Sequence, residues 1–166
     1  MSDSEHKPSN PFVRGTQGYE RNVSAFLEAC ERLDFATVHA VILPLLPAPE
    51  RRVLEVGAGS GRDAAALAAL GHRVVAIEPF DTFRHYAQFH HPDPRITWHN
   101  DALPQLATLP AYPSFDVIMV HAVWMHLDAQ ERQCAMPRLA ALLARCGVLF
   151  VALRHGLVPA GKRMFA

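Results

Sequence analysis

The sequence predicts an α/β fold in which a doubly wound, mostly parallel sheet carries helices on both faces. Short apolar runs alternate with stretches of helical periodicity along most of the chain. These runs are apolar throughout instead of at every second residue, which is typical of parallel strands that are buried on both faces. The first run leads directly into the glycine turn 57–61 and then into a helix, the order expected of a ligand-binding α/β domain.

Two helices are expected before the first strand. Apolar residues recur there at the spacing i, i+3, i+4, i+7 of one helical face, and the pattern then repeats. The positions are Val23, Phe26, Leu27 and Cys30, followed by Val38, Val41, Ile42 and Leu45. Residues 1–18 have no such period and mix Ser, Pro, Gly and charge, so we interpret them as a flexible N-terminal arm ahead of a single domain, 19–166.

The remaining elements follow in regular alternation. Strands are expected at 52–56, 73–77, 95–98, 115–120 and 148–153, and helices at 63–70 and 82–89. Gly71 stands at the position after a helix where a left-handed residue is common. Asp128 and Glu131 have the spacing of a capping box, and the helix that they begin should run to about Arg145, with a bend or restart at Pro137.

Composition narrows the function. The 166 residues contain 16 Lys and Arg and 16 Asp and Glu, so the field that draws proteins to nucleic acids or anionic membranes is missing. Cys30, Cys134 and Cys146 form no CxxC pair, which argues against a disulfide framework or a thiolate zinc site. No apolar segment is long enough for a signal core or a membrane span. We therefore expect a cytoplasmic protein with no nucleic-acid or membrane partner.

The turn Gly57-Ala-Gly-Ser-Gly61 predicts a bound nucleoside. Small residues allow the backbone to turn sharply and a ligand to lie close, and Glu78 at the end of the second strand can accept hydrogen bonds from two ribose hydroxyls. In the alternative interpretation, the glycines serve only helix packing and Glu78 is a solvated strand end. A dinucleotide is disfavoured because the spacing is GxGxG instead of GxGxxG, and because Asp63 would repel a pyrophosphate.

At these residues the chain resembles the class I S-adenosylmethionine-dependent methyltransferases, which share a Rossmann-like fold. Val53 to Asp63 is similar to the family's first motif, Glu78 to its ribose-binding acid and Asp101 to its adenine-binding acid. Residues 116–120 and 122–127 resemble the fourth strand and the segment that flanks the methionine part of the cofactor. The resemblance implies S-adenosyl-L-methionine as cofactor. The implied cofactor-binding residues are Glu55, Gly57, Ala58, Gly59, Gly61, Glu78, Pro79, Asp101, Ala102 and His121.

Methyl transfer obliges no particular catalytic side chain, since positioning and exclusion of water do most of the work. Weak catalytic candidates lie where strands end, namely His121, Arg154 and His155, although a wall residue is the preferred interpretation of His121. Candidates for acceptor contact are Tyr19, Trp124, Arg154 and His155, with Arg14 as a possible part of a lid. No metal is expected, because His90, His91 and His99 lack a metal-ligand spacing. Family members that methylate exocyclic or amide nitrogens carry an Asn-Pro-Pro-Tyr type of motif, and its absence here favours a small-molecule acceptor.

Family members usually add an antiparallel pair of strands beyond the fifth, whereas this chain stops at Ala166, so we expect a sheet without its last two strands. Either the protein is a fragment, or a partner chain covers the open edge. An apolar fifth strand at 148–153 would then be an edge that invites a partner. The alternative function is therefore a catalytically incomplete cofactor-binding or scaffold protein that dimerises through this edge.

Overall fold

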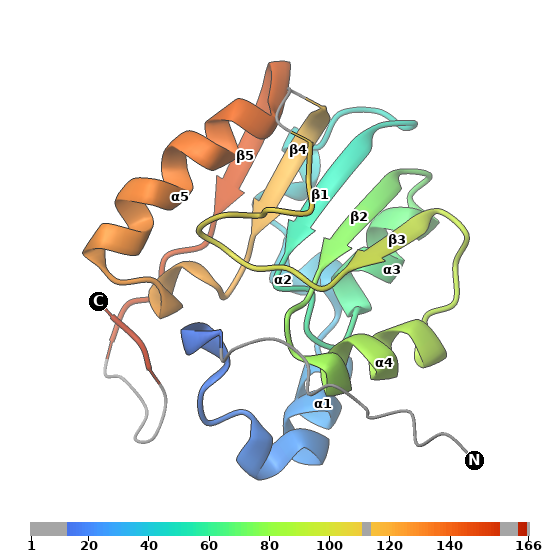
Figure 1. Cartoon of the computed structure of the whole chain (residues 1–166). Helices are drawn as coiled ribbons and strands as arrows, with labels where there is room; N and C mark the ends of the chain where they lie inside the picture. Colours follow the sequence, from blue (N-terminus) through green and yellow to red (C-terminus); the bar gives the residue numbers. More distant parts are fainter. Residues whose placement is uncertain (1–12, 111–113, 157–162, 166) are drawn as a thin grey trace, which may run out of the picture.

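The structure, a computed structural model, describes residues 13–110, 114–156 and 163–165. Its centre is the doubly wound, five-stranded parallel sheet that the sequence predicted, and the strand order is β3-β2-β1-β4-β5 (Figure 1). The strands are β1 (Arg52–Val56), β2 (Arg73–Ile77), β3 (Ile96–His99), β4 (Phe115–Val120) and β5 (Leu143–Val151). The strand order reverses between β1 and β4, so this is the point at which a doubly wound sheet opens a ligand crevice.

The central strands β1, β2 and β4 are buried on both faces, which explains why they are mostly apolar. Neighbouring residues of β1 point to opposite sides: Leu54 and Val56 join one core cluster, and Val53 joins the other. Helix α5 (Ala129–Leu142) and the loop around Leu106 cover the first cluster. Helix α3 (Arg62–Ala69) covers the second, so the helices lie on both faces of the sheet (Figure 1).

Helix α4 (Asp81–His90) follows β2 and packs close to the beginning of α3, where Ala87 approaches Gly61. Gly71 ends the α3 turn at φ +95°, the left-handed conformation expected there. The Asp128–Glu131 capping box is present at the start of α5, with both hydrogen bonds at 2.8 Å. The position of α4, the end of α3 at Gly71 and the start of α5 at Asp128 therefore agree with the local sequence signals.

The N-terminal region differs from expectation. Helix α1 (Val23–Glu31) forms, but the second helix, α2 (Phe35–Val38), has only four residues and is followed by a 3₁₀ turn at Leu43–Leu45. Val41 and Leu45, two positions of the expected apolar face, are 84% and 61% exposed. The prediction of a longer second helix was wrong because the buried position in this segment is the polar His39.

The last residues of the expected arm, 13–18, form turns. Residues 1–12 lie outside the described part of the chain, while a 3₁₀ turn at Arg14–Thr16 and the adjacent Gly18 precede a second such turn, Glu20–Asn22. The side chain of Arg14, considered for a lid, also lies outside the described atoms.

The boundary between α5 and β5 is earlier than predicted. The helix was expected to reach about Arg145, yet it ends at Leu142, and Leu143 already pairs with Phe115 of β4. A register shift follows, with Cys146 at φ +63° and Gly147 close to the Asp116 carbonyl, before regular pairing resumes at Val148. Pro137 lies inside a single helix, so the expected restart does not occur. The irregular stretch hides the strand's start from any periodicity argument.

Strand β5 is the edge of the sheet in the described residues, paired to β4 alone. This agrees with a methyltransferase-like sheet without the final antiparallel pair. Among the described residues, no helix has both the length and the apolar character that a membrane crossing requires.

Candidate functional site

A cavity of about 390 Å³ opens at the carboxyl ends of β1, β2 and β4. Its position coincides with the reversal of strand order between β1 and β4, and its size is within the range of small-molecule sites. The lining residues come from the glycine turn, from the segments after β2, β3 and β4, from the N-terminal region and from the C-terminal residues Arg163 and Met164.

The three glycines of the turn serve different purposes. All have positive φ, of +73°, +57° and +86° at Gly57, Gly59 and Gly61, a conformation that costs other residues energy. A Cβ added to Gly57 would stand 2.3 Å from the Val123 side chain, and one added to Gly61 would stand 2.7 Å from Ala87. Of the three, only Gly59 has room for a Cβ, which would make an ordinary contact with the Phe26 ring at 3.9 Å. The packing interpretation thus holds at Gly57 and Gly61, and ligand approach is left to Gly59.

Glu78 lies directly beside this turn. Its Oε2 accepts a hydrogen bond from the Gly59 N–H at 2.8 Å, and its Oε1 accepts one from the Phe80 N–H at 2.9 Å. Burial raises the pKa of Glu78 to about 7, against the opposing effect of these two hydrogen bonds. The carboxyl group is therefore fixed in orientation, faces the cavity and retains lone pairs for a further donor.

Asp101 is also at the cavity, one strand further along. Its Oδ2 accepts hydrogen bonds from the backbone and the hydroxyl of Thr108, both at 2.7 Å, and its Oδ1 accepts from Ala102 N–H at 2.8 Å. These contacts fix the loop after β3 and leave the carboxylate spare lone pairs. The two acids therefore stand at neighbouring strand ends, as the sequence predicted.

Glu55 has a buried oxygen with no hydrogen-bond partner among the described residues, Oε2. The residue lines the cavity, and burial, followed by repulsion from Asp63, raises its pKa well above the usual value. An unpaired buried oxygen costs stability unless a ligand supplies a donor. The site thus fits a ligand that carries a hydrogen-bond donor at this end of β1.

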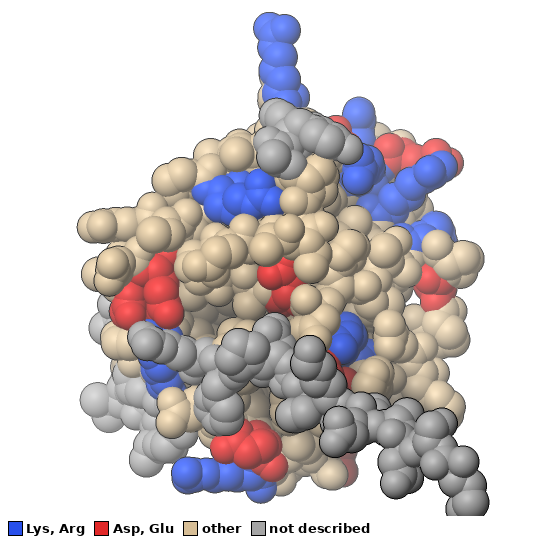
Figure 2. Space-filling model, in the orientation of Figure 1, with Lys and Arg blue, Asp and Glu red and all other residues tan. Residues whose placement is uncertain are grey.

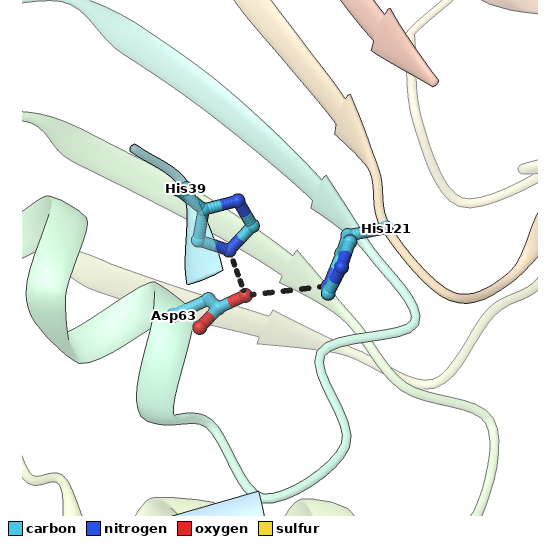
Figure 3. A group of neighbouring side chains, drawn as sticks. All are labelled: His39, Asp63 and His121. Carbon is cyan, nitrogen blue, oxygen red and sulfur yellow. Dashed lines mark hydrogen bonds and ion pairs between the residues drawn. The ribbon is translucent and has the colours of Figure 1, made fainter. Parts of the chain in front are cut away.

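The sequence did not predict a further cluster of side chains at the cavity. It includes the end of β4, which lies on the other side of β1 from β3 and Asp101. His39, Asp63 and His121 converge there from α2, α3 and the end of β4 (Figure 3). The His39 Nε2 lies 2.7 Å from Asp63 Oδ2, and Arg62 donates to Asp63 Oδ1 at 2.7 Å. The His121 Nδ1 lies 3.8 Å from the same Oδ2. We call this group the histidine cluster.

The charges in the histidine cluster follow from its contacts. Burial acts to raise the pKa of Asp63, but the hydrogen bond from His39 and the Arg62 charge outweigh it and hold the pKa below the usual value. Because the carboxylate is ionised, His39 Nε2 must be the donor. Burial, followed by electrostatic repulsion between the two rings when both are protonated, lowers the pKa of His121 below its usual value.

Aromatic residues enclose another part of the cavity. Tyr19 packs edge-on against Phe26 and Phe83, and its hydroxyl lies 3.1 Å from His126 Nε2. The Nδ1 of His126 lies 2.8 Å from the Arg163 carbonyl, to which it can only donate, so Nε2 accepts the Tyr19 O–H. Burial raises the pKa of Tyr19 to about 12, which keeps that hydroxyl protonated.

Most of the predicted site residues border the cavity, and three do not. Trp124 packs half-buried against the core, His155 is exposed, and Gly61 contacts Ala87 and Trp98. Sequence analysis missed His39, Phe26 and Phe83, which no local motif marks, and it did not single out His126 within the segment 122–127. The predicted site residues that do border the cavity are Tyr19, Glu55, Gly57, Ala58, Gly59, Glu78, Pro79, Asp101, Ala102, His121 and Arg154.

Several solved structures share this fold. A TehB-like S-adenosylmethionine-dependent methyltransferase from Corynebacterium glutamicum is 20% identical, with a TM-score of 0.60 over 79% of this chain and 68% of that one. An S-adenosylmethionine-dependent methyltransferase from Mesorhizobium loti is 20% identical, with a TM-score of 0.61 over 70% and 53%. The N-methyltransferase NodS from Bradyrhizobium japonicum is 24% identical, with a TM-score of 0.59 over 68% and 64%. At these identities the likeness concerns the fold.

The chain thus spans between 53% and 68% of the lengths of these three proteins. No curated protein matches the sequence. The profile of the methyltransferase domain family, however, matches residues 53–147, which run from β1 through the irregular start of β5 and contain the glycine turn, Glu78 and Asp101. The chain therefore belongs to the methyltransferase domain family, which implies S-adenosylmethionine as its cofactor.

Proposed function

We propose that this chain is an S-adenosylmethionine-dependent methyltransferase whose acceptor is a small molecule. The observation that carries the proposal is the position of Glu78, whose carboxyl group borders the cavity and lies 2.8 Å from the backbone nitrogen of Gly59. A carboxylate on the second strand, held against an open glycine, is suited to bind the two hydroxyls of a ribose.

Other cavity residues are candidates for contacts with the remaining parts of the cofactor and with the acceptor. Asp101 is the candidate for the adenine amino group, and Glu55 offers its unpartnered Oε2 to a donor at the methionine end. S-adenosylmethionine supplies a methyl group on a sulfonium, which transfers by in-line displacement. What the chain contributes is orientation of the two reactants and exclusion of water, for which an enclosed cavity with aromatic walls is suited.

Acceptor contact is proposed for Tyr19, His121 and Arg154, which border the cavity. His155 and Trp124 have no such support. The cavity of about 390 Å³ suits a small acceptor better than a polymer. Figure 2 shows one face of the molecule, where basic and acidic side chains are interspersed among uncharged residues, a distribution that does not favour a polyanion.

Thermal unfolding with added ligands tests the cofactor. S-adenosylhomocysteine should raise the melting temperature in proportion to the logarithm of its excess over the dissociation constant, whereas NAD at equal concentration should not. The reverse result would favour a dinucleotide-binding protein and contradict the proposal.

Replacement of Glu78 tests the ribose contact. Glu78→Ala should weaken binding of S-adenosylhomocysteine by about 1 to 3 kcal/mol in calorimetry, since a charge-assisted hydrogen bond is lost. The matched control is Glu28→Ala, which removes an exposed carboxylate from α1. Equal affinity in the two variants would mean that the ribose is bound elsewhere.

A second candidate is a cofactor-binding protein without turnover that dimerises through β5. It is favoured by the position of β5 at the sheet edge, where Val148 is 37% exposed. Incubation with labelled S-adenosylmethionine and a metabolite panel, together with sedimentation, separates the two functions. Methylated product from a monomer supports the first, and a cofactor-bound dimer without product supports the second.

We also propose a cytoplasmic location. Cys30, Cys134 and Cys146, all within the described residues, form no disulfide, as is typical of proteins in a reducing compartment. Alkylation of all three thiols in protein purified without reductant is the expected result.

A further inference from the structure

Three potential metal ligands from separate parts of the chain meet at the histidine cluster. His39 follows α2, Asp63 is in the first turn of α3, and His121 follows β4 (Figure 3). We propose that His39, Asp63 and His121 form a binding site for one divalent transition-metal ion of the class that prefers imidazole, such as Zn²⁺ or Co²⁺. Cofactor binding by the glycine turn does not require this site, and the site does not require the cofactor.

The separations are close to those of a metal centre. Each residue offers one ligand atom, and these atoms lie within 4.8 Å of one another. Ligands that bind a common ion at about 2.0 to 2.1 Å stand roughly 3 Å apart. The His39 Nε2 and Asp63 Oδ2 are 2.7 Å apart, and the His121 Nδ1 is 3.8 Å from the same oxygen. A small movement of the His121 ring would therefore complete the set.

Burial favours a specific site over a surface cluster. The side chains of His39 and Asp63 are 3% and 7% exposed, while that of His121 is 36% exposed and borders the cavity. Two ligands would be shielded from water and the third lies at the opening. Two imidazoles and one carboxylate leave coordination positions open, and here these would face the cavity.

The surroundings of the Asp63 carboxylate also suit its role as a metal ligand. Arg62 donates to Asp63 Oδ1 and thereby fixes the orientation of Oδ2 toward both histidines. An ion-pair network that merely anchors α2 to α3 would account for Arg62, Asp63 and His39. The His121 ring packs edge-on against the His39 ring, with 4.7 Å between the ring centroids, and this packing brings its Nδ1 to 3.8 Å from the same oxygen.

Binding has a defined proton balance. The His39 Nε2 proton now lies between that nitrogen and Asp63 Oδ2. A metal ion can bind Nε2 only once this proton has left that nitrogen; in a neutral ring the proton moves to Nδ1 and none is released to solvent. If the proposed methyl transfer is correct, the open positions would hold an oxygen or nitrogen atom of the acceptor. That role rests on the proposed function.

The test is titration of the metal-stripped full chain with Co²⁺, followed by visible absorption. One equivalent should produce ligand-field bands, and Zn²⁺ should abolish them. His121→Gln should weaken Co²⁺ binding by at least about 10- to 100-fold, the scale on which even outer partners act. His90→Gln is the matched control, because that exposed imidazole lies outside the histidine cluster, bonds to a carbonyl of its own helix and packs against Tyr86 and Phe89.

His121→Gln is the decisive variant because it leaves the buried His39–Asp63 contact intact. Absence of cobalt bands, or equal Co²⁺ affinity in His121→Gln and the unaltered chain, would overturn the proposal. The same samples are tested for S-adenosylhomocysteine binding. Metal binding without that affinity contradicts the proposed function alone, and the reverse result contradicts the metal site alone.

Discussion

The two sides of the cavity differ in how the chain builds them. The proposed nucleoside side, formed by the glycine turn, Glu78 and Asp101, comes from three strand ends within residues 57–101 and depends on backbone turns and hydrogen bonds to backbone nitrogens. The histidine cluster instead joins residues 39, 63 and 121 through side chains. One side is therefore determined locally, while the other exists only after the sheet has assembled.

This difference has energetic consequences. On the nucleoside side, positive φ angles and close packing restrict which residues fit, whereas the histidine cluster depends on buried charges that must stay paired. Substitutions should therefore act on the first side through strain or lost ligand contacts, and on the second through uncompensated charge.

The largest effect is expected at Asp63. Asp63→Ala would leave the Arg62 guanidinium, 15% exposed, and the buried His39 without their shared carboxylate. Removing one partner of a buried ion pair costs about 3 to 5 kcal/mol, to be measured as the free energy of unfolding in urea. Glu28→Ala, which breaks an exposed pair with Arg32, should cost less than about 1 kcal/mol. Similar losses in both variants would mean that the histidine cluster does not hold α2 against α3.

A somewhat smaller loss is expected at the glycine turn. Gly57→Ala forces a Cβ to within 2.3 Å of Val123 at a φ of +73°, and the clash and strain together should cost about 2 to 4 kcal/mol. Gly59→Ala, with 3.9 Å of space, should cost only about 1 to 2 kcal/mol but should impair cofactor binding. Urea unfolding and calorimetry on both variants separate these effects. Equal stability losses would show that Val123 yields to the added methyl group.

The sequence predicts the parts of the molecule that local patterns determine and not those that form only when distant residues meet. All five strands follow from local apolar runs, apart from the irregular start of β5, and the position of Glu78 beside the glycine turn follows from the order of strand, turn, helix and strand. The histidine cluster does not, since nothing in the sequence around His39 distinguishes a buried hydrogen-bonding imidazole from a helix surface. The same gap misled the prediction at Val41 and Leu45, where apolar spacing suggested a buried face that the structure exposes.

The pH dependence of nucleoside binding tests Glu78. The pKa of Glu78, about 7, lies above the usual value of 4.5. The protonated carboxyl group therefore contributes its full stabilisation of the fold below pH 4.5, and this contribution is lost as the pH rises through 7. Ribose hydroxyls donate hydrogen bonds and therefore favour the ionised Glu78 carboxylate. The affinity for the nucleoside should thus rise with pH, while the contribution of Glu78 to stability falls. Adenosine, which carries no amino-acid group, should bind up to about tenfold more tightly at pH 8 than at pH 6 in calorimetry. Glu78→Gln should remove this dependence, and a dependence that persisted would have to come from another group.

The smallest effect is expected at Tyr19. Because His126 Nδ1 donates to the Arg163 carbonyl, its Nε2 can only accept, and Tyr19→Phe leaves that buried acceptor without the hydroxyl. The loss should be about 1 kcal/mol in urea unfolding. Tyr86→Phe is the matched control: its ring stacks on the exposed His90, and its stability should change by less than about 0.5 kcal/mol. Equal effects would mean that packing against Phe26 and Phe83, which Tyr19→Phe keeps, holds this segment over the cavity and that the hydrogen bond contributes little.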